Sequence, residues 1–360
     1  MYQTVAYKNL AGDYILIDVR SPGEHEYATI PGAISLPIFD DEQRSRIGQV
    51  YVNESIEKAK QIGVSAVAQR LPYIYERILG LNKDYDKLVF FCAKGGMRSA
   101  SLVALMVELG VKAVKLKEGY KGYRAFINEQ LPQLNKKLRY IVIHGKTGTG
   151  KTRILEKLMD AGYDVLDLEK AANHRGSLLG SVGLGKENSQ KLFESLVYES
   201  LKKAKNSWIF VEGESKRIGN SIIPQYIFES MVQGTHLLVE APLALRAETL
   251  IKDYTASLNF QDEIISAIEN MEKYIGEKQV KRYSDLVRLG DFKEAAMELM
   301  VKYYDPMYSK EFNNYHFDLI FTLESVGRGS DVIEKWFADW RSEKTRESLE
   351  TTDKKPGSAL

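Results

Sequence analysis

A glycine-rich octapeptide near the middle of the chain constrains the fold most strongly. Residues 145–152 read GKTGTGKT and fit the pattern G-x-x-x-x-G-K-[ST] without departure. The apolar run YIVIH precedes the octapeptide, and the amphipathic segment RILEKLMDAG follows it. Strand, glycine loop and helix in this order are typical of a phosphate-binding loop, because backbone N–H groups and the helix N-terminus then point at phosphate oxygens. The octapeptide therefore predicts an α/β domain built around a phosphate site.

The loop residues have separate expected roles. The expected diphosphate contacts are Gly145, Gly148, Gly150, Lys151 and Thr152. Lys151 should bridge terminal phosphate oxygens, and the Thr152 hydroxyl would contact Mg²⁺ if a metal binds. A nucleotide hydrolase also needs an acid at the end of a neighbouring strand. Asp167 and Glu212 are the candidates, and each fits a structural ion pair equally well. Because such a loop binds any diphosphate, the ligand need not be a nucleotide, and a Mg²⁺ requirement stays open.

A second candidate site lies in the stretch FFCAKGGMRSAS, residues 90–101, which contains Cys92, the only cysteine of the chain. A lone cysteine is more often a small buried apolar residue than a nucleophile. Here, however, Cys92 ends an apolar run, where a parallel sheet places its sites. Arg98 and the start of the next helix should stabilise a thiolate and a bound anion. We therefore predict a reactive Cys92 and Arg98, with an oxyanion cradle formed by Lys94, Gly95 and Gly96.

The rest of the chain follows an α/β pattern with helical additions. Apolar runs at 14–19, 87–92 and 112–116, with a helical period over 98–110, predict a first parallel-sheet domain. Apolar runs at 164–168, 208–212 and 236–241 predict further strands of the phosphate-loop domain. The predicted organisation is a first domain over 1–135, a phosphate-loop domain over 136–241, a mainly helical segment over 242–342 that packs on it and returns a strand at 317–322, and a disordered charged tail over 343–360.

Bulk composition excludes several classes of protein. A chain of 360 residues exceeds one ordinary core, so two or three domains are expected. A net charge of +1 excludes a uniformly basic coat for nucleic acid, although local basic patches remain compatible with it. One cysteine forms no internal disulfide, which fits a reducing compartment. The N-terminal residues show no secretory pattern and the apolar runs are strand-sized, so we expect a cytoplasmic protein without a membrane partner.

The first domain resembles a known family. LIDVRSPGEHEYATIPGAISLPI, residues 16–38, resembles the N-terminal signature of rhodanese domains. The resemblance implies a cysteine that carries a sulfane-type atom as a persulfide, and Asp18, Arg20 and Glu24 should form a buried ion-pair network. The spelling C-x5-R also resembles cysteine phosphatases that share the rhodanese fold, although Phe91 stands where those usually have histidine. Both readings stay open here, and a selenophosphate or thiophosphate substrate would satisfy both.

Both sites together narrow the resemblance further. The segments FCAKGGMRS, EGYKGYRAF, DLEKAANHRGSLLGSVG and VEGESKRIGN occur in one order around the phosphate loop. In this combination, residues 16–220 resemble the tRNA 2-selenouridine synthase family. The resemblance implies a rhodanese-like parallel-sheet domain followed by a P-loop α/β domain. It also implies replacement of sulfur by selenium at C2 of 2-thiouridine: geranylation of the sulfur by geranyl diphosphate, then displacement with selenium from selenophosphate.

The same resemblance supplies expected partners and contacts. The partner is tRNA, bound through an anticodon region with 2-thiouridine at the wobble position, and the small-molecule ligands are phosphates. No tightly bound cofactor and no dedicated metal site are expected. Further candidate contacts to substrate or phosphate are His174, Arg175, Ser177, Glu212, Glu214, Ser215 and Arg217. Tyr120 and Tyr123 fit either stacking on RNA bases or the core. A phosphatase or sulfurtransferase fused to a nucleotide-binding module, and a regulatory P-loop module, are the alternative functions.

Overall fold

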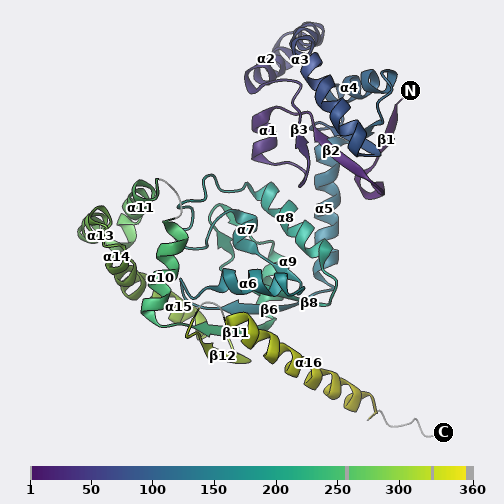
Figure 1. Ribbon diagram of the computed structural model, residues 1–360. Helices are drawn as coiled ribbons and strands as arrows, with labels where there is room; N and C mark the ends of the chain where they lie inside the picture. Colours follow the sequence, from purple (N-terminus) through teal and green to yellow (C-terminus); the bar gives the residue numbers. More distant parts are fainter. Residues whose placement is uncertain (1, 256–258, 326–327, 354–360) are drawn as a thin grey trace, which may run out of the picture. The chain divides into compact units, whose positions relative to one another are not determined.

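The protein, seen as a computed structural model, contains two compact units (Figure 1). The structure describes residues 2–255, 259–325 and 328–353. Unit 1 comprises Met1–Lys136 and Asn188–Lys202, and unit 2 comprises Lys137–Glu187 and Lys203–Leu360. Within the described ranges, no helix combines the length and the apolar character that a membrane crossing requires.

Unit 1 holds a parallel sheet and its helices. Its elements are β1 (Gln3–Val5), the 3-10 helix η1 (Tyr7–Asn9), β2 (Tyr14–Asp18), α1 (Pro22–Tyr27), β3 (Ile34–Ser35), α2 (Asp41–Asn53), α3 (Ile56–Asp84), β4 (Lys87–Phe91), α4 (Met97–Glu108), β5 (Ala113–Leu116), α5 (Gly119–Asn135) and, from later in the chain, α8 (Gln190–Lys203). The strand order is β1-β5-β4-β2-β3, and every pairing is parallel. The predicted parallel sheet is confirmed, and Cys92 follows its central strand.

The sheet of unit 1 is buried on both faces, as parallel sheets require. Leu88, Val89, Phe90 and Phe91 of β4 are all fully buried. Helices α3 and α4 contribute to the core beside β2 and β4. The pair α2 and α3 lies between β3 and β4 in sequence and was not anticipated.

Helix α8 is the main difference from the predicted domain boundaries. We placed its residues in the phosphate-loop domain, but they cluster with unit 1. Arg124 of α5 forms an ion pair with Glu194 and donates a hydrogen bond of 3.2 Å to the Ser195 hydroxyl. Phe126 of α5 also contacts Tyr198 edge-on, with 6.2 Å between the ring centres. Long-range side-chain contacts of this kind leave no periodic signal in the sequence.

Unit 2 also holds a parallel sheet, followed by helices. Its elements are β6 (Arg139–His144), α6 (Lys151–Asp160), β7 (Val165–Leu166), α7 (Leu168–Ala172), β8 (Trp208–Glu212), β9 (Arg217–Ile218), β10 (Ser221–Ile222), α9 (Gln225–Val232), β11 (Thr235–Glu240), α10 (Leu243–Tyr254), α11 (Phe260–Glu269), α12 (Glu272–Ile275), α13 (Glu277–Leu289), α14 (Phe292–Leu299), the π-helix η2 (Met300–Tyr304), α15 (Asp305–Phe312), β12 (Leu319–Thr322) and α16 (Gly329–Asp353).

The sheet of unit 2 places the phosphate loop at its centre (Figure 1). Its strand order is β12-β11-β6-β8-β7, and all pairings are parallel. The loop leaves the end of β6, and Glu212 at the end of the neighbouring β8 pairs in register with Ile143. The returning strand predicted at 317–322 is present as β12. The strand predicted at 164–168 is only two residues long, because Asp167 instead caps α7 by accepting the backbone N–H of Lys170.

The C-terminal part of unit 2 is mainly helical, as expected. Helices α10, α11, α13 and α14 share one apolar core, whereas Ile333 and Phe337 of α16 join the core under the sheet. The tail predicted to be disordered from residue 343 is instead helical as far as Asp353. Its Glu, Lys and Arg residues are good helix formers, so low apolar content does not end the helix. Residues 354–360 of that predicted tail lie outside the described residues.

Candidate functional site

Cys92 lies in unit 1 between the end of β4 and the start of α4. It is 3% exposed, and the Ser99 hydroxyl donates a hydrogen bond of 3.3 Å to its sulfur. Burial raises the pKa of the Cys92 thiol, but hydrogen bonds from Ser99 and the backbone of Lys94, with the charge of Arg98, outweigh it. The net result is a pKa below the ordinary cysteine value, which favours a thiolate nucleophile.

The start of α5 packs closely against the backbone of the cysteine loop. Gly95 has a φ of +62°, and a Cβ at this position would lie 2.9 Å from the backbone nitrogen of Glu118. A Cβ at Gly119 would overlap the carbonyl oxygen of Cys92. That carbonyl accepts the N–H of Tyr120 at 2.9 Å. The segment EGYKGYR therefore shapes the loop, because only glycine fits where the two backbones meet.

Arg98 is already paired inside unit 1. Its guanidinium donates two hydrogen bonds to the Glu24 carboxylate, at 2.5 and 3.2 Å. Glu24 lies in the first turn of α1, where it also accepts the backbone N–H of Ser21 at 3.2 Å. Burial raises the pKa of Glu24, but the Arg98 hydrogen bonds and charge hold it below its usual range. An incoming anion would therefore share or displace Glu24. Among the other expected cradle residues, Gly95 bends the loop, while Lys94 and Gly96 are exposed.

The predicted buried ion-pair network is confirmed for Asp18 and Arg20. The Asp18 carboxylate accepts hydrogen bonds from Arg20, with the shortest at 2.6 Å, and both residues are buried. The Arg20 guanidinium lies 4.3 Å from the ring centre of Tyr120. Tyr120 and Tyr123 are 7% and 0% exposed. Their positions favour the core role over stacking on RNA bases.

The phosphate loop of unit 2 has the geometry its glycines predict. Gly148 and Gly150 have φ values of +79° and +85°, which disfavour other residues. α6 begins at Lys151, so its N-terminal end faces the loop. The Lys151 ammonium donates a hydrogen bond of 2.8 Å to the carbonyl of Gly145 and is 9% exposed. Burial lowers the pKa of Lys151, but neighbouring Tyr308 and carboxylates raise it above the ordinary value, so the cation persists.

Two glutamates stand beside the loop. Thr152 donates a hydrogen bond of 3.1 Å to the Glu169 carboxylate, and the backbone N–H of Glu169 donates one of 2.7 Å to Glu212. The second carboxylate oxygen of Glu212 is buried, and no described group hydrogen-bonds to it. Burial, with the charges of Asp167 and Glu169, raises the pKa of Glu212 well above its usual range. The neutral form of Glu212 is therefore favoured more strongly than in an exposed glutamate.

Sequence reasoning missed the residues that brace the loop from α10 and α15. The buried Arg246 donates a hydrogen bond of 2.9 Å to the carbonyl of Thr147 and pairs with Asp305 through contacts of 2.9 and 2.6 Å. Tyr308 accepts a hydrogen bond of 3.2 Å from the Thr147 hydroxyl. A signal existed for Arg246, because it falls on the apolar stripe of α10, where a charge needs a buried partner.

The loop after α7 holds three of the predicted contact residues in structural roles. Arg175 lies 4.8 Å over the Tyr254 ring and donates hydrogen bonds of 2.5 and 3.0 Å to the carbonyls of Val182 and Asp253. Ser177 hydrogen-bonds the Tyr254 hydroxyl at 3.1 Å. His174 is buried, and its Nε2 lies 3.9 Å from a carboxylate oxygen of Glu187. These residues fix the loop to α10.

The last predicted contacts separate into two groups. Glu214 approaches Gly176 so closely that a Cβ there would lie 2.5 Å from its carboxylate, and it adds negative charge around Lys151. Ser215 and Arg217 are exposed and bond the backbone of the β9–β10 hairpin, at 2.8 and 2.9 Å. The structure therefore brings Glu212 and Glu214 to the phosphate loop and leaves Ser215 and Arg217 outside it.

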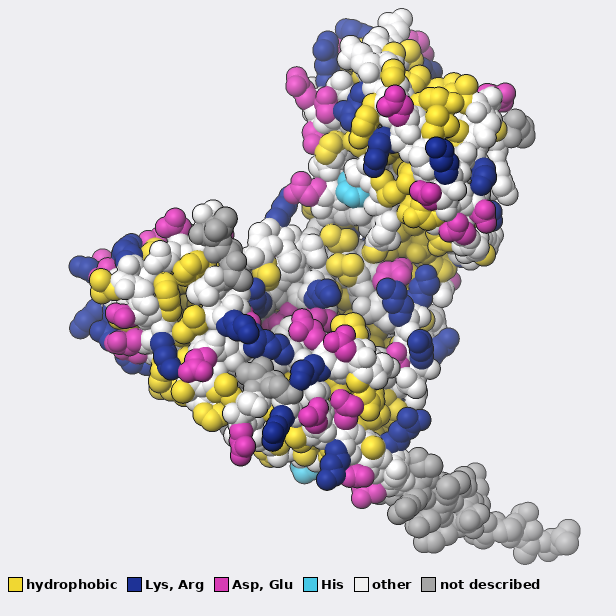
Figure 2. All heavy atoms as spheres, viewed as in Figure 1, with side chains coloured by type: hydrophobic (Ala, Val, Ile, Leu, Met, Phe, Trp, Pro, Cys, Tyr) yellow, Lys and Arg dark blue, Asp and Glu magenta, His cyan; other side chains and the backbone are white. Residues whose placement is uncertain are grey.

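Charged side chains on the surface are mixed in sign. On the face that Figure 2 shows, Lys and Arg side chains alternate with Asp and Glu rather than forming one basic surface. Arg282 of α13, for example, forms ion pairs with Glu294 and Glu298 at 2.8 and 2.5 Å. The tRNA-binding surface therefore stays a prediction.

Comparisons with known proteins agree with this arrangement of two sites. Residues 138–340 match the family described as tRNA 2-selenouridine synthase AAA domain, and residues 3–126 match the rhodanese-like domain. The first match spans more than half of the chain. The chain belongs to the tRNA 2-selenouridine synthase family. The family resemblance and the fold class inferred from the sequence are thereby confirmed.

Relatives in this family are similar over most of the chain. The tRNA 2-selenouridine synthase of Marinobacter nauticus is 29% identical over 365 residues, which cover 92% of this chain and 96% of the relative. The Nitrosomonas eutropha protein of the same name is 31% identical over 247 residues, or 67% of this chain and 63% of the relative. A solved N-terminal domain from Clostridium difficile 630 is 38% identical, covers 35% of this chain and 98% of its own, and has a TM-score of 0.34.

Proposed function

We propose that this protein is a tRNA-modifying transferase that replaces sulfur by selenium at C2 of 2-thiouridine at the wobble position. The observation that carries the proposal is a thiol with a lowered pKa, set beside Arg98, in the same family chain as an intact phosphate loop. A phosphate loop alone does not call for a reactive cysteine, and a reactive cysteine alone does not call for a phosphate loop. A selenium donor and a diphosphate-activated alkyl donor together require both. The reaction takes place in the cytoplasm, where the single free cysteine is kept reduced.

In the first step the phosphate loop holds geranyl diphosphate. The thiouridine sulfur attacks the allylic carbon, its C–O bond breaks, diphosphate leaves, and one proton is lost from the base. Lys151 and the loop N–H groups stabilise the negative charge that develops on the departing diphosphate. S-alkylation makes C2 electrophilic and turns a poor leaving group into a thiol. The buried Lys151 cation is suited to this work, because its charge persists beside the carboxylates.

In the second step selenium from selenophosphate replaces the geranylthio group. Selenophosphate, water and the alkylated base yield 2-selenouridine, geranylthiol and phosphate, so every atom is accounted for. The cysteine loop and Arg98 bind the phosphate part of the donor, and Cys92 handles the selenium. The selenium nucleophile adds to C2, and the C–S bond breaks as the thiol leaves.

A Mg²⁺ ion fits beside the phosphate loop. Mg²⁺ binds to one or two carboxylates together with phosphate oxygens. The Thr152 hydroxyl and Glu169 are already joined, and the unpartnered buried oxygen of Glu212 lies one hydrogen bond further on. These residues would hold the ion against the diphosphate, where it would neutralise the leaving group. In the described part of the chain no three His, Cys, Asp or Glu side chains form a complete metal site, so the ion would arrive with its ligand.

Two variants test the division of labour. Lys151→Ala should stop the reaction at 2-thiouridine, because the alkyl donor is not bound. Cys92→Ser should let the S-geranylated nucleoside accumulate, because only the selenium step is lost. Mass spectrometry of nucleosides from tRNA of cells that carry each variant as the sole copy measures both. If both variants stop at 2-thiouridine, the assignment of Cys92 to the second step is wrong. If wild type forms no 2-selenouridine, the proposed function is wrong.

A further inference from the structure

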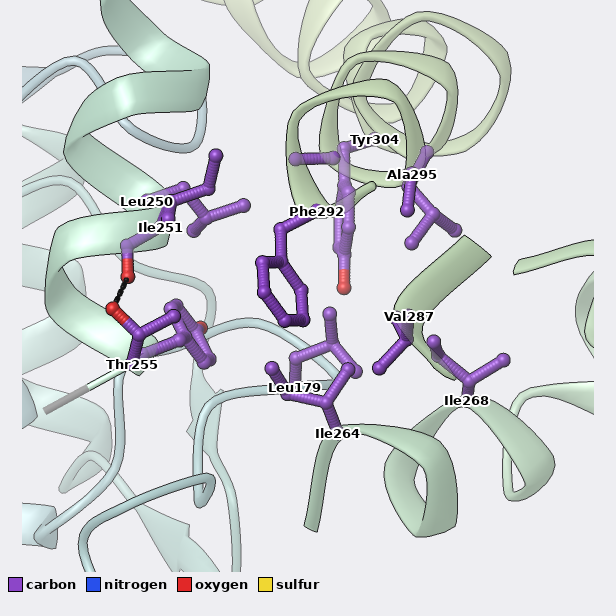
Figure 3. Close-up of a pocket in the computed structure, with 13 residues that line it drawn as sticks. Leu179, Leu250, Ile251, Thr255, Ile264, Ile268, Val287, Phe292, Ala295 and Tyr304 are labelled. Carbon is purple, nitrogen blue, oxygen red and sulfur yellow. Dashed lines mark hydrogen bonds between the residues drawn. The ribbon is translucent and has the colours of Figure 1, made fainter. Parts of the chain in front are cut away.

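An apolar cavity lies among the helices that follow the sheet of unit 2 (Figure 3). Its volume is about 50 Å³, and its walls come from α10, α11, α13, α14 and the loop after α7. Leu179, Ile268 and Ala295 are among the buried lining residues. The partly buried Phe292 ring lies centrally in the view, and it contacts Phe260 edge-on with 5.4 Å between ring centres. Phe292 is therefore a partly buried part of the cavity wall.

Two tyrosines contribute hydroxyl groups to the lining of this cavity. Tyr254 and Tyr304 both line the cavity, and the Tyr254 hydroxyl is hydrogen-bonded to Ser177. The Tyr304 hydroxyl is buried, and it finds no hydrogen-bond partner among the residues that the structure describes. Burial raises the pKa of Tyr254 to about 12, so it remains a hydroxyl at neutral pH. A ligand that turns from polar to apolar would find matching groups here.

Side-chain contacts connect α10, beside the cavity, to the first turn of α6. Asp253, which precedes Tyr254 in α10, accepts a hydrogen bond of 2.7 Å from Arg153. Arg153 follows Thr152 in the first turn of α6. The backbone carbonyl of Asp253 accepts a hydrogen bond of 3.0 Å from Arg175, whose guanidinium covers the Tyr254 ring. Tyr308, one helical turn beyond the lining residue Tyr304, also accepts a hydrogen bond of 3.2 Å from the Thr147 hydroxyl of the phosphate loop. The cavity lining and the phosphate loop are therefore about one helical turn apart along this segment.

We propose that this cavity receives the hydrocarbon tail of the ligand whose diphosphate the phosphate loop binds. The proposal rests on the proposed function and adds the place of the tail. A nucleoside would leave its polar base edges without partners in an apolar site, which costs free energy. An acyclic hydrocarbon has no hydrogen bonds to lose in such a cavity, and its transfer out of water is favourable in free energy. The physical selection is therefore for an alkyl or prenyl diphosphate over a nucleotide.

The cavity must widen to accept such a tail, so side chains of its wall must move when the tail binds. An apolar cavity of about 150 Å³ binds one benzene molecule, so the 50 Å³ present here is too small for a ten-carbon tail without movement of the lining. Phe292 is a partly buried residue of the wall on α14, so a smaller side chain there would enlarge the cavity. Ala295 lies one turn further along the same helix. Tail length should therefore be limited by the side chains at positions 292 and 295.

Calorimetric titration of the full chain with three probes tests this site. The probes are inorganic diphosphate, dimethylallyl diphosphate and geranyl diphosphate. Wild type should bind geranyl diphosphate at least tenfold more tightly than inorganic diphosphate, with the shorter tail between them. Ala295→Leu fills the cavity and should remove most of this advantage without changing the affinity for inorganic diphosphate. Ala338→Leu, which adds the same side chain at an exposed position of α16, should behave as wild type.

A second variant keeps the proposal testable if Ala295→Leu fails to fold. Phe292→Ala enlarges the cavity and should improve the binding of farnesyl diphosphate relative to geranyl diphosphate. Equal affinities for all three probes in wild type, or an unchanged tail preference in both variants, would overturn the cavity assignment. If wild type still makes geranylated nucleoside in that case, the proposed function stands and only the tail site is wrong. If geranyl diphosphate itself does not bind, the proposed function is wrong.

Discussion

Replacing Ser99 by alanine is expected to weaken Cys92 as a nucleophile. Ser99 is fully buried, and its hydroxyl lies 3.3 Å from the Cys92 sulfur. Its hydrogen bonds are the largest of the interactions that lower the pKa of Cys92 against burial. Without the hydroxyl, the pKa of Cys92 rises. A smaller fraction of the sulfur is then thiolate at any pH below that pKa.

The size of the effect follows from the kind of hydrogen bond lost. A hydrogen bond to a charged group contributes about 1.5–3 kcal/mol, and the backbone N–H groups and the Arg98 charge remain in the variant. The lower end of that range applies, because the bond is long. About 1.4 kcal/mol corresponds to one pKa unit, so the pH at which half of the sulfur is thiolate should rise by about one unit.

The single cysteine of the chain makes the measurement clean. The rate of alkylation by iodoacetamide, followed against pH, reports the thiolate of Cys92 alone. Ser101→Ala is the matched control, because Ser101 lies in the same helix, is exposed, and donates only to backbone carbonyls, with the nearer, that of Met97, at 2.8 Å. The Ser99→Ala profile should move to higher pH and the control profile should not. Superimposable profiles for Ser99→Ala and wild type would refute the account of the lowered pKa.

Three further predictions concern the ion pairs beside the sites. Glu24→Gln should strengthen the binding of inorganic phosphate about fivefold, since a partly exposed pair contributes about 1 kcal/mol, and protection of the thiol from alkylation measures it. Arg98 holds the pKa of Glu24 below its usual range in the folded protein. The stability that this pair contributes is therefore fully present above about pH 4.3, the pKa of an unperturbed glutamate, and is lost as the pH falls through the lowered pKa of the folded protein. The melting temperature of wild type should therefore fall more steeply in acid than that of Glu24→Gln. Asp305→Asn should lower the free energy of unfolding by about 3 kcal/mol, because Arg246 is 4% exposed and loses its charge partner. In the same denaturant titration, the control Glu294→Gln, which lies in an exposed ion pair, should lower it by under about 1 kcal/mol. Equal losses in the two variants would contradict the argument from burial.

The structural features that the sequence predicted depend on local patterns of residues. The strand, loop and helix around residues 139–160 and the strand before Cys92 depend on contacts between near neighbours and on glycine at fixed positions. The return of β12 to the sheet was also predictable, because its apolar run stands between helical segments. Helix α16 was cut short in the prediction, since a charged, apolar-poor segment was read as disorder although its residues favour a helix.

The structural features that the sequence did not predict depend on contacts between residues that lie far apart in the chain. Glu24 was expected in a buried network with Asp18, but it pairs with Arg98, which is 74 residues away in the chain. α8 follows the phosphate loop in sequence and yet packs on α5. Such pairings are decided by tertiary geometry, and one sequence carries no record of them. A charge on an apolar helix stripe, as at Arg246, is the kind of local clue that does point to a distant partner.

The three principal cations of the two sites are satisfied before any ligand arrives. Arg98 is held by Glu24, Lys151 by the carbonyl of Gly145, and Arg246 by Asp305. Since a buried cation without a partner is costly, these internal acceptors stabilise the free protein. A ligand that binds at these cations replaces some of these internal contacts. Its net affinity is therefore the difference between the free energy of its own contacts and that of the contacts it replaces. Ligands with several negative charges, such as a diphosphate or a phosphate-linked selenium, can make that difference favourable, whereas a singly charged anion gains little by exchange. Selection for multiply charged substrates therefore follows from the internal pairing of the sites as much as from their cationic residues.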